Sequence, residues 1–457
     1  MEEASGAARA ALVSVEASAP GKLILFGEHS VVYGAQAVAG AVSDLRIYVR
    51  VTLRPAADPR RPALVIGLPV LDSGRPSSEA DRAADAAAAA SSSLPPLVRQ
   101  AVVPLAFLVV TALGDVVGLP SADPAVAAAA KTVPGTAQDD EDFDEEDDVD
   151  ADPDADVEGG PQPTGAAART LGAAAAAPAP GSAGRTAGPA APCFQPLDVE
   201  LELTRSTLPV GSGLGSSAAL AVAAAGALLT ARAHLDGCTV SLHAVNAWAL
   251  AAETLFHGTP SGLDNTVATF GGLLRFRKFP AEMKPVVLGG PEAAARGEAL
   301  PPELDVVIIN THAPKNTKAL VAGVRTLKDA QPDVVGPILT AMDGIAKAAV
   351  ESLEAGSQGG GSRDFGLGRL ASANHNLLCA IGVGHPALDA VVSDARDHGL
   401  SAKLTGAGGG GCAFALVPPT GHDGSDVDSF EATSARRGFS WFRTRVGGAG
   451  GGARVEE

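Results

Sequence analysis

The pattern of apolar and polar positions predicts a β layer near the start of the chain. From Val13 the sequence predicts a strand, a glycine turn and a second strand, with an apolar run over 22–26 and a more regular alternation over 45–53. A strict alternation over 197–203 predicts a further strand with one buried face. The first elements of the fold are therefore expected to be strands.

Helical segments dominate the rest of the pattern. The longest charge-free apolar runs, 101–114 and 218–231, are shorter than the roughly 20 residues that a membrane-spanning helix requires, so we expect both to lie in buried helices. The remaining pattern predicts a helix over 97–113, a strand over 306–309, helices over 317–326, 334–355 and 367–379, a glycine-rich linker over 356–361, and a strand–turn element over 402–416. This mixture favours an α+β fold over a doubly wound parallel sheet.

Residues 118–192 interrupt this pattern. Alanine, proline and glycine dominate the segment, and between Asp139 and Glu158 there are 14 acidic residues and no lysine or arginine. Such a composition offers too few large apolar side chains for a packed core, so it predicts a long disordered insertion. A solvated insert is favoured over an acidic segment that binds a partner.

Composition and charge narrow the class of protein. The 457 residues are 46 % hydrophobic, which suits a globular protein of two or three domains. The formal charge of −18 argues against binding to nucleic acid or to an anionic membrane surface, although the insertion alone supplies most of it. Four scattered cysteines without a C-x-x-C pair argue against a zinc site and against disulfides, so we expect a cytoplasmic protein. The opening Met1-Glu2-Glu3 has no basic segment, and a cleaved signal peptide is not expected.

The first candidate site is a glycine-rich segment between a predicted strand and a predicted helix, Gly211-Ser212-Gly213-Leu214-Gly215-Ser216-Ser217. Alternating glycines permit a tight turn that directs backbone N–H groups at phosphate oxygens. The segment has neither the lysine of a Walker loop nor the spacing of a dinucleotide fingerprint. The alternative is a flexible loop in which Ser216 or Ser217 only caps the helix.

Two other segments place polar groups beside turns. Lys22 begins an apolar strand, and Glu28 and His29 follow its far end; the alternatives are a solvated lysine and a surface hydrogen bond. The segment 403–412 is rich in glycine, so its backbone could approach a ligand or another loop closely. A tight turn before a core strand explains this segment nearly as well.

A pair of carboxylates defines the last candidate. Glu253 lies near the end of one predicted helix and Asp264 begins the next, so one carboxylate could bind Mg²⁺ and the other could accept a proton. The spacing from Ser261 to Asp264 also fits a capping box, in which Asp264 would only stabilise the start of its helix. The sequence supports both interpretations equally.

In this order the segments resemble the motifs of the GHMP small-molecule kinases. The resemblance rests on Pro20-Gly21-Lys22 with Gly27-Glu28-His29, on the glycine segment 211–217, and on Lys403-Leu-Thr-Gly-Ala-Gly-Gly-Gly-Gly-Cys412. Within that superfamily, the stretches 27–34, 257–265 and 313–325 are most similar to the mevalonate kinase branch. A galactokinase would be expected to carry Asp-Tyr soon after the Glu-His pair, where this chain has Val31-Val32.

The resemblance covers roughly 13–114 and 196–415, and it implies a two-lobed α+β fold with the active site between the lobes. The amino-terminal lobe is then expected over 13–290, interrupted by the insertion at 118–192, and the carboxy-terminal lobe over 301–450. The insertion itself resembles nothing in the family.

Roles for single residues follow from the same resemblance. It implies that Asp264 is the catalytic base and that Lys22 pairs with it and touches ATP. ATP phosphates would be held by Ser206 and by Gly211, Ser212, Gly213, Leu214, Gly215, Ser216 and Ser217, and Mg²⁺ by Ser217 and Glu253. The substrate side would comprise Glu28, His29, Thr311, Gly406 and Ala407.

The implied function is ATP- and Mg²⁺-dependent phosphorylation of mevalonate at its 5-hydroxyl, an early step of isoprenoid synthesis. Mevalonate and ATP would be the small-molecule partners, and because members of the family often dimerise, a homodimer is an expectation. Two alternatives stay open. One is another GHMP kinase, acting on phosphomevalonate, homoserine or a sugar; the other is a non-catalytic binding protein of the same fold, which would be free to lose the site residues that this chain has.

Overall fold

The computed structural model describes residues 11–57, 63–67, 105, 108, 196–209, 211–257, 260–297, 300–356, 366–418 and 424–456. The predicted insertion and most of the helix predicted over 97–113 lie outside the described residues, as does the linker after Gly356. Leu105 and Leu108 are helical and fully buried. All described residues belong to one folded unit.

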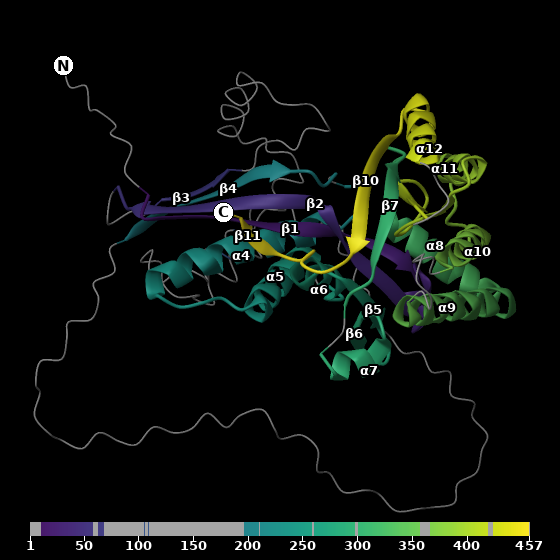
Figure 1. Cartoon of the computed structure of the whole chain (residues 1–457), viewed down its shortest axis with the longest axis horizontal. Helices are drawn as coiled ribbons and strands as arrows, with labels where there is room; N and C mark the ends of the chain where they lie inside the picture. The colour runs from purple at the N-terminus through teal and green to yellow at the C-terminus, as the bar shows by residue number, and fades with distance from the viewer. Residues whose placement is uncertain are drawn as a thin grey trace, which may run out of the picture. The chain divides into compact units, whose positions relative to one another are not determined.

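The strands form one branched sheet whose main path has the order β11-β1-β2-β10-β7-β9-β8 (Figure 1). Along that path the strands are β11 (Arg454–Glu456), β1 (Val13–Phe26), β2 (Gln36–Pro55), β10 (Ser440–Gly447), β7 (Glu303–Asn310), β9 (Cys412–Leu416) and β8 (Ser401–Leu404). Off the path are β3 (Leu64–Gly67), β4 (Leu197–Ser206), β5 (Leu273–Arg277) and β6 (Glu282–Val286), of which β4 and β5 pair with β2. Among the described strands the pairing is antiparallel except between β3 and β4. The predicted α+β fold is confirmed.

The helices form two groups, one near β1 and β2 and the other near β7, β8 and β9. Those packed on or beside β1 and β2 are α4 (Ser216–Asp236), α5 (Leu242–His257) and α6 (Leu263–Phe270), and the short α7 (Gly290–Ala295) follows β6. Those around β7, β8 and β9 are α8 (Thr317–Ala330), α9 (Pro332–Ala355), α10 (Leu367–Ala380), α11 (Pro386–Asp397) and α12 (Gly424–Arg436), and the 3-10 turn η1 (Ser30–Tyr33) lies against α9. Figure 1 shows α4, α5 and α6 together on one face of the β1–β2 region.

The predicted strand, glycine turn and second strand are confirmed: β1 and β2 are joined by a turn that contains Gly27 and Gly34, both at positive φ. Strand β1 itself runs without interruption through Pro20 and Gly21, and only its register against β2 shifts between these two residues. Gly21 serves a close approach, because a Cβ at this position would lie 2.7 Å from the carbonyl oxygen of Leu214. The loop of the glycine segment therefore rests directly on the middle of β1.

Alternation in β4 works as predicted. Leu197, Val199, Leu201 and Leu203 are buried, and the residues between them are partly or fully exposed. Their apolar face joins the larger hydrophobic core, which includes the central residues of β1, β2 and α4. A second core lies among β7, β8, β9 and the helices α9 to α11.

Helix α4 is the one described helix long and apolar enough to cross a membrane by length and composition. However, 72 % of its most hydrophobic window is buried within the fold. Alanine at nine of its 21 positions lets the helix pack closely on β1 and β2. These properties are those of a core helix, as the sequence predicted.

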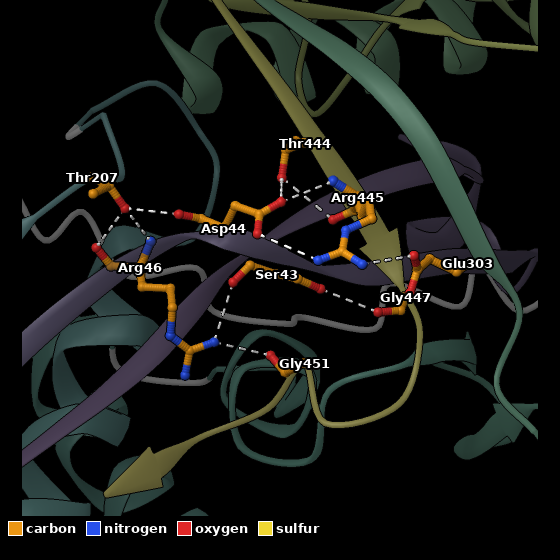
Figure 2. Close-up of polar contacts among 9 residues, drawn as sticks. All are labelled: Ser43, Asp44, Arg46, Thr207, Glu303, Thr444, Arg445, Gly447 and Gly451. Carbon is orange, nitrogen blue, oxygen red and sulfur yellow. Dashed lines mark hydrogen bonds and ion pairs between the residues drawn. The ribbon is translucent and has the colours of Figure 1, made fainter. Parts of the chain in front are cut away.

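Arg46 anchors the segment that follows β10 (Figure 2). The residue is 1 % exposed, and its guanidinium donates hydrogen bonds to the carbonyls of Gly451 at 3.3 Å and Gly452 at 2.8 Å. Burial lowers the pKa of Arg46 to about 10, so it stays charged at neutral pH. Beyond these glycines the Ala453 N–H donates to the Thr269 carbonyl at 3.0 Å, which fixes the end of α6. Arg46 thus supports the helix whose first turn carries Asp264.

Candidate active site

Lys22 and Asp264 form the centre of the candidate site. The Nζ atom of Lys22, in β1, lies 3.0 Å from Oδ1 of Asp264, in the first turn of α6. The lysine side chain is 10 % exposed and the aspartate side chain 33 % exposed, so the pair is accessible from the aspartate side. Residues 242 positions apart in sequence are brought together here, as the resemblance implied.

Asp264 does not belong to a capping box. The N-cap of α6 is Gly262, in a left-handed conformation and without a side-chain cap. Ser261 Oγ accepts a hydrogen bond from the Leu263 N–H at 3.3 Å, not from the N–H of Asp264. The carboxylate of Asp264 is turned to Lys22 instead, and the capping-box alternative is wrong.

The glycine segment covers this pair and begins α4. Its N-cap is Gly215, again left-handed, and no side chain caps the helix, so the alternative in which Ser216 or Ser217 is the cap is wrong. The Lys22 N–H donates to the Leu214 carbonyl at 2.8 Å. The amino-terminal end of this long helix, where the helix dipole favours an anion, thus lies close to the lysine.

Gly215 is the position at which the segment touches the ion pair, and replacing it should impair the site. An added Cβ would lie 2.9 Å from Cγ of Lys22 and 3.7 Å from Oδ2 of Asp264, at a backbone φ of +75°. We expect Gly215→Ala to displace Lys22 and to lower kcat/KM at least about tenfold.

Gly211→Ala is the matched control for this prediction, to be assayed in parallel steady-state measurements. Gly211 has nearly the same φ, +74°, but nothing within 4 Å of its Cβ position. Both variants therefore bear similar backbone strain. If Gly211→Ala lost as much activity as Gly215→Ala, strain and not the contact with Lys22 would explain the effect.

Glu253 completes the acidic part of the site. The residue is 4 % exposed, its side chain is hydrogen-bonded to Ser217, and its Oε1 atom is buried without a hydrogen-bond partner. Burial, together with the nearby charge of Asp264, raises the pKa of Glu253 to about 7, while Ser217 and Lys22 oppose this rise. A buried carboxylate oxygen without a partner, beside a hydroxyl and a second carboxylate, fits a hard divalent cation.

A second group of predicted residues surrounds the loop between β8 and β9. The Nε2 atom of His29 lies 2.9 Å from the carbonyl oxygen of Ala407, and the Thr311 hydroxyl donates to the Gly411 carbonyl at 2.7 Å. A Cβ at Gly406 would meet nothing within 4 Å, so this side of the loop is open. Two of the predicted substrate-side residues, His29 and Ala407, thus contact each other, and Thr311 contacts the same loop at Gly411.

Glu28 and Ser206 are placed differently. Both carboxylate oxygens of Glu28 contact protein side chains, Lys403 and Asn374, and its side chain is 0 % exposed. Ser206 lies at the end of β4, where its hydroxyl donates to the Leu208 carbonyl at 2.9 Å. Neither side chain contacts the Lys22–Asp264 pair in the contacts of the described residues.

Lys315 is a residue to which the sequence analysis gave no role. Its Nζ atom donates to the Ser212 carbonyl at 3.1 Å and would lie 2.7 Å from a Cβ at Gly411, so it joins the two glycine loops. Burial lowers the pKa of Lys315, and the charge of Lys22 adds to this effect. The signal in the sequence was a lysine between the end of a strand and the Asn316 cap of α8, within a stretch that already resembled the family.

One cluster elsewhere contains groups that can bind metals. Nε2 of His375, Sγ of Cys379 and a carboxylate oxygen of Asp389 lie within 4.8 Å of one another. The Leu404 N–H donates to Nδ1 of His375 at 3.4 Å, which leaves the ring proton on Nε2, pointing at Asp389. A metal would need the lone pair of Nε2, so these contacts favour a hydrogen-bonded cluster.

Two family models match parts of the chain. The model of the GHMP kinases N terminal domain matches residues 183–272, and that of the GHMP kinases C terminal matches residues 364–432. The chain is thus similar to the GHMP kinases over these two segments.

Mevalonate kinases are among the curated proteins to which the chain is similar. The human mevalonate kinase is 38 % identical over 257 residues, which cover 54 % of this chain and 61 % of the human protein. The mevalonate kinase of Schizosaccharomyces pombe is 40 % identical over 223 residues, which cover 47 % of this chain and 52 % of that protein. The chain thus matches about three fifths or less of the length of these two relatives.

Solved structures support the fold. The mevalonate kinase of L. major, crystallised with R-mevalonate, aligns over 96 % of this chain and 99 % of its own, with a TM-score of 0.58 and 21 % identity. The galactokinase of Lactococcus lactis aligns over 97 % of this chain and 95 % of its own, with a TM-score of 0.52 and 16 % identity. Substrate classes differ between these two, so the fold alone does not select a substrate.

Proposed function

We propose that the protein transfers the γ-phosphoryl group of ATP to the 5-hydroxyl of mevalonate. The observation that carries this proposal is the convergence of Lys22, Asp264, Gly215 and Glu253 at one place, where a phosphate site, a proton acceptor and a cation site lie side by side. The identity of the curated relatives supports mevalonate as the acceptor.

ATP and Mg²⁺ are the proposed cofactors. The start of α4 with its glycine segment would hold the ATP phosphates, and Ser217 and Glu253 would hold Mg²⁺, for which the partnerless Oε1 of Glu253 is suited. Mg²⁺ would supply charge neutralisation at the β- and γ-phosphate oxygens. Lys315, between the two glycine loops, adds a positive charge on the side of the site that faces Lys22.

The residues of the chain have simple tasks in this reaction. The substrate hydroxyl oxygen attacks the γ-phosphorus, the bond from that phosphorus to the bridging β,γ-oxygen breaks, and Asp264 accepts the hydroxyl proton. Lys22 fixes the carboxylate of Asp264 by their 3.0 Å contact and lies against the glycine segment. Because phosphoryl transfer needs little covalent catalysis, positioning and electrostatics account for most of the expected rate.

A coupled ADP-release assay tests the proposal. Purified protein with Mg-ATP is assayed in parallel with mevalonate, phosphomevalonate, homoserine and galactose. Turnover with mevalonate alone is the expected result. Turnover with another alcohol would leave the kinase chemistry in place and refute the substrate, and a lack of turnover with all four would favour the non-catalytic alternative.

We further propose a homodimer that works in a reducing, cytoplasmic compartment. The free thiols of Cys238, Cys379 and Cys412 support the reducing compartment. Light scattering after size-exclusion chromatography tests the dimer, which would double the 45.4 kDa mass of the chain.

A further inference from the structure

A buried ion pair joins the segment after β1 to the strand before the second glycine loop. The Nζ atom of Lys403, in β8, contacts Oε1 of Glu28, and both side chains are 0 % exposed. The second carboxylate oxygen of Glu28 accepts a hydrogen bond from Nδ2 of Asn374, in α10, at 3.1 Å. Both oxygens of Glu28 therefore face protein partners in a fully buried position, although its sequence position suggested a substrate contact.

The ion pair is one of three links between residues 24–29 and residues 403–407. His29, the neighbour of Glu28, lies 2.9 Å through Nε2 from the Ala407 carbonyl. Thr405, two residues after Lys403, donates its hydroxyl to the Ile24 carbonyl at 2.8 Å. The links enclose a short cycle of chain, from Glu28 to Lys403, along the backbone to Ala407, and back through His29.

His29 is held in this cycle in an uncommon backbone conformation. Its φ of +58° lies in the left-handed region, which residues with a Cβ seldom adopt. Such a conformation persists only where the surroundings enforce it. The neighbouring ion pair, the Ala407 contact and a hydrogen bond from the Val32 N–H to the His29 carbonyl at 3.1 Å hold this residue.

The surroundings of Lys403 suit an ammonium group that is paired with a carboxylate inside the protein, and not one that binds a ligand. The rings of Phe26 and Phe414 lie 5.8 and 5.3 Å from its Nζ atom, and Nζ also donates to the Leu404 carbonyl at 2.7 Å. Burial lowers the pKa of Lys403, and Glu28 counteracts this. An ammonium in such a place needs its carboxylate, because either charge alone would be buried without compensation.

We infer that Glu28 and Lys403 are a pair of positioning residues that fix His29 and Ala407 on the substrate side of the site, and that Glu28 does not touch the substrate. This inference rests on the proposed function. It differs from direct substrate binding in a testable way, because the two charges then act only through each other.

Three variants in the full chain test the inference: Lys403→Met, Glu28→Gln and the double variant. Lys403→Met leaves the Glu28 carboxylate uncompensated, so we expect its KM for the acceptor alcohol to rise about tenfold or more, with the KM for ATP within about twofold of the wild type. Glu28→Gln should raise the acceptor KM less than Lys403→Met does. The double variant removes both charges and should recover an acceptor KM within about threefold of the wild type.

Asp394→Asn is the matched control. Asp394 is a largely buried partner of Arg437, with an Oδ1 to Nη2 distance of 2.7 Å, and the pair joins α11 to the chain after α12. Breaking it should lower the melting temperature and leave both KM values unchanged. The control thus separates a loss of stability from a loss of positioning.

A double variant that binds the acceptor no better than Lys403→Met would overturn the inference and assign Glu28 to the substrate. Melting temperatures that fall while the acceptor KM stays constant in all three variants would overturn it too, since the pair would then be structural only. If Lys403→Met does not fold, the comparison of Glu28→Gln and the double variant with the wild type still decides between these cases.

An NMR measurement keeps this test separate from the proposed function. The ring resonance of His29, assigned with a His29→Gln variant, reports the geometry of the cycle without any substrate. It should shift in Lys403→Met, return in the double variant and stay in place in Asp394→Asn. An unchanged His29 resonance in Lys403→Met refutes the inference even if the wild type phosphorylates none of the four alcohols, and the expected shifts support it in that case.

Discussion

Asp264→Asn is expected to lower kcat about a thousandfold while the protein stays folded and binds ATP. The asparagine amide has nearly the same shape but cannot accept the hydroxyl proton, and loss of general-base catalysis costs on the order of 10²–10⁴ in rate. The variant also loses the ion pair with Lys22, which lies 3.0 Å away. Steady-state kinetics with Mg-ATP and mevalonate, together with a melting curve, measure both effects.

Asp333→Asn serves as the control, because Asp333 occupies the first turn of α9 as Asp264 occupies the first turn of α6. Both substitutions remove a favourable interaction with the helix dipole, worth about 0.3–1 kcal/mol, but only one touches the site. Turnover of Asp264→Asn within about tenfold of the wild type would exclude this residue as the base.

The double variant Lys22→Met/Asp264→Asn tests whether the two residues act as a unit. Because they contact each other directly, their effects on kcat should not add. We expect the double variant to be little slower than Asp264→Asn alone. Fully additive losses would show that Lys22 acts on the phosphates independently of Asp264.

Glu253→Gln is expected to have opposite effects on activity and on stability. Activity should fall about a hundredfold or more, because an amide is a poor replacement for a carboxylate ligand of Mg²⁺. The metal-free fold should become more stable at pH 8, because the substitution removes a buried carboxylate whose Oε1 has no partner.

The sign of the pH dependence follows from the pKa of Glu253. Folding raises this pKa from 4.5 to about 7, mainly through burial. The folded state therefore binds the proton of Glu253 more tightly than the unfolded state. The stability that this proton adds to the fold is fully present below pH 4.5 and is lost as the pH rises through about 7. A shift of this size corresponds to about 3 kcal/mol of unfolding free energy. Urea unfolding without Mg²⁺ at pH 5 and pH 8 should show this loss in the wild type and not in Glu253→Gln.

Adding Mg²⁺ and ATP should reverse the order of stability at pH 8, because only the wild type has the carboxylate that binds the cation. Glu431→Gln is the control, since Glu431 is also buried but pairs with Arg443 at 2.9 Å, so its replacement should destabilise the fold at both pH values. If Glu253→Gln were less stable than the wild type at pH 8 without metal, the charged Glu253 carboxylate would not destabilise the fold as proposed.

Much of the fold was predictable because its signals are local. The alternation in β4 marks a strand with one buried face, and the long run of small apolar residues in α4 marks a core helix. The predicted strand–turn element near the carboxy terminus corresponds to β8 and β9. Local signals did not explain Gly21, whose missing Cβ leaves room for the carbonyl oxygen of Leu214 in a loop far away in sequence.

The candidate site was predictable in part. The glycine segment, Lys22 and Asp264 stand in motifs whose residue types and order identified them, and the fold brings them together. The same motifs suggested that Glu28 faces the substrate, whereas the fold surrounds it with Lys403 and Asn374. Lys315 was passed over because nothing in its own stretch indicates that two distant glycine loops meet at its Nζ atom.

The sequence by itself determined which segments are strands, helices and glycine-rich loops, since these properties depend on side-chain periodicity and backbone freedom within a few residues. Tertiary structure alone decided which charges are buried and with what partners. Glu28 and Lys403 are 375 positions apart, and Lys315 and Ser212 are 103 apart. Desolvation and ion pairing act through space, so the protonation of Glu253 and the internal role of Glu28 became visible only when the chain was folded.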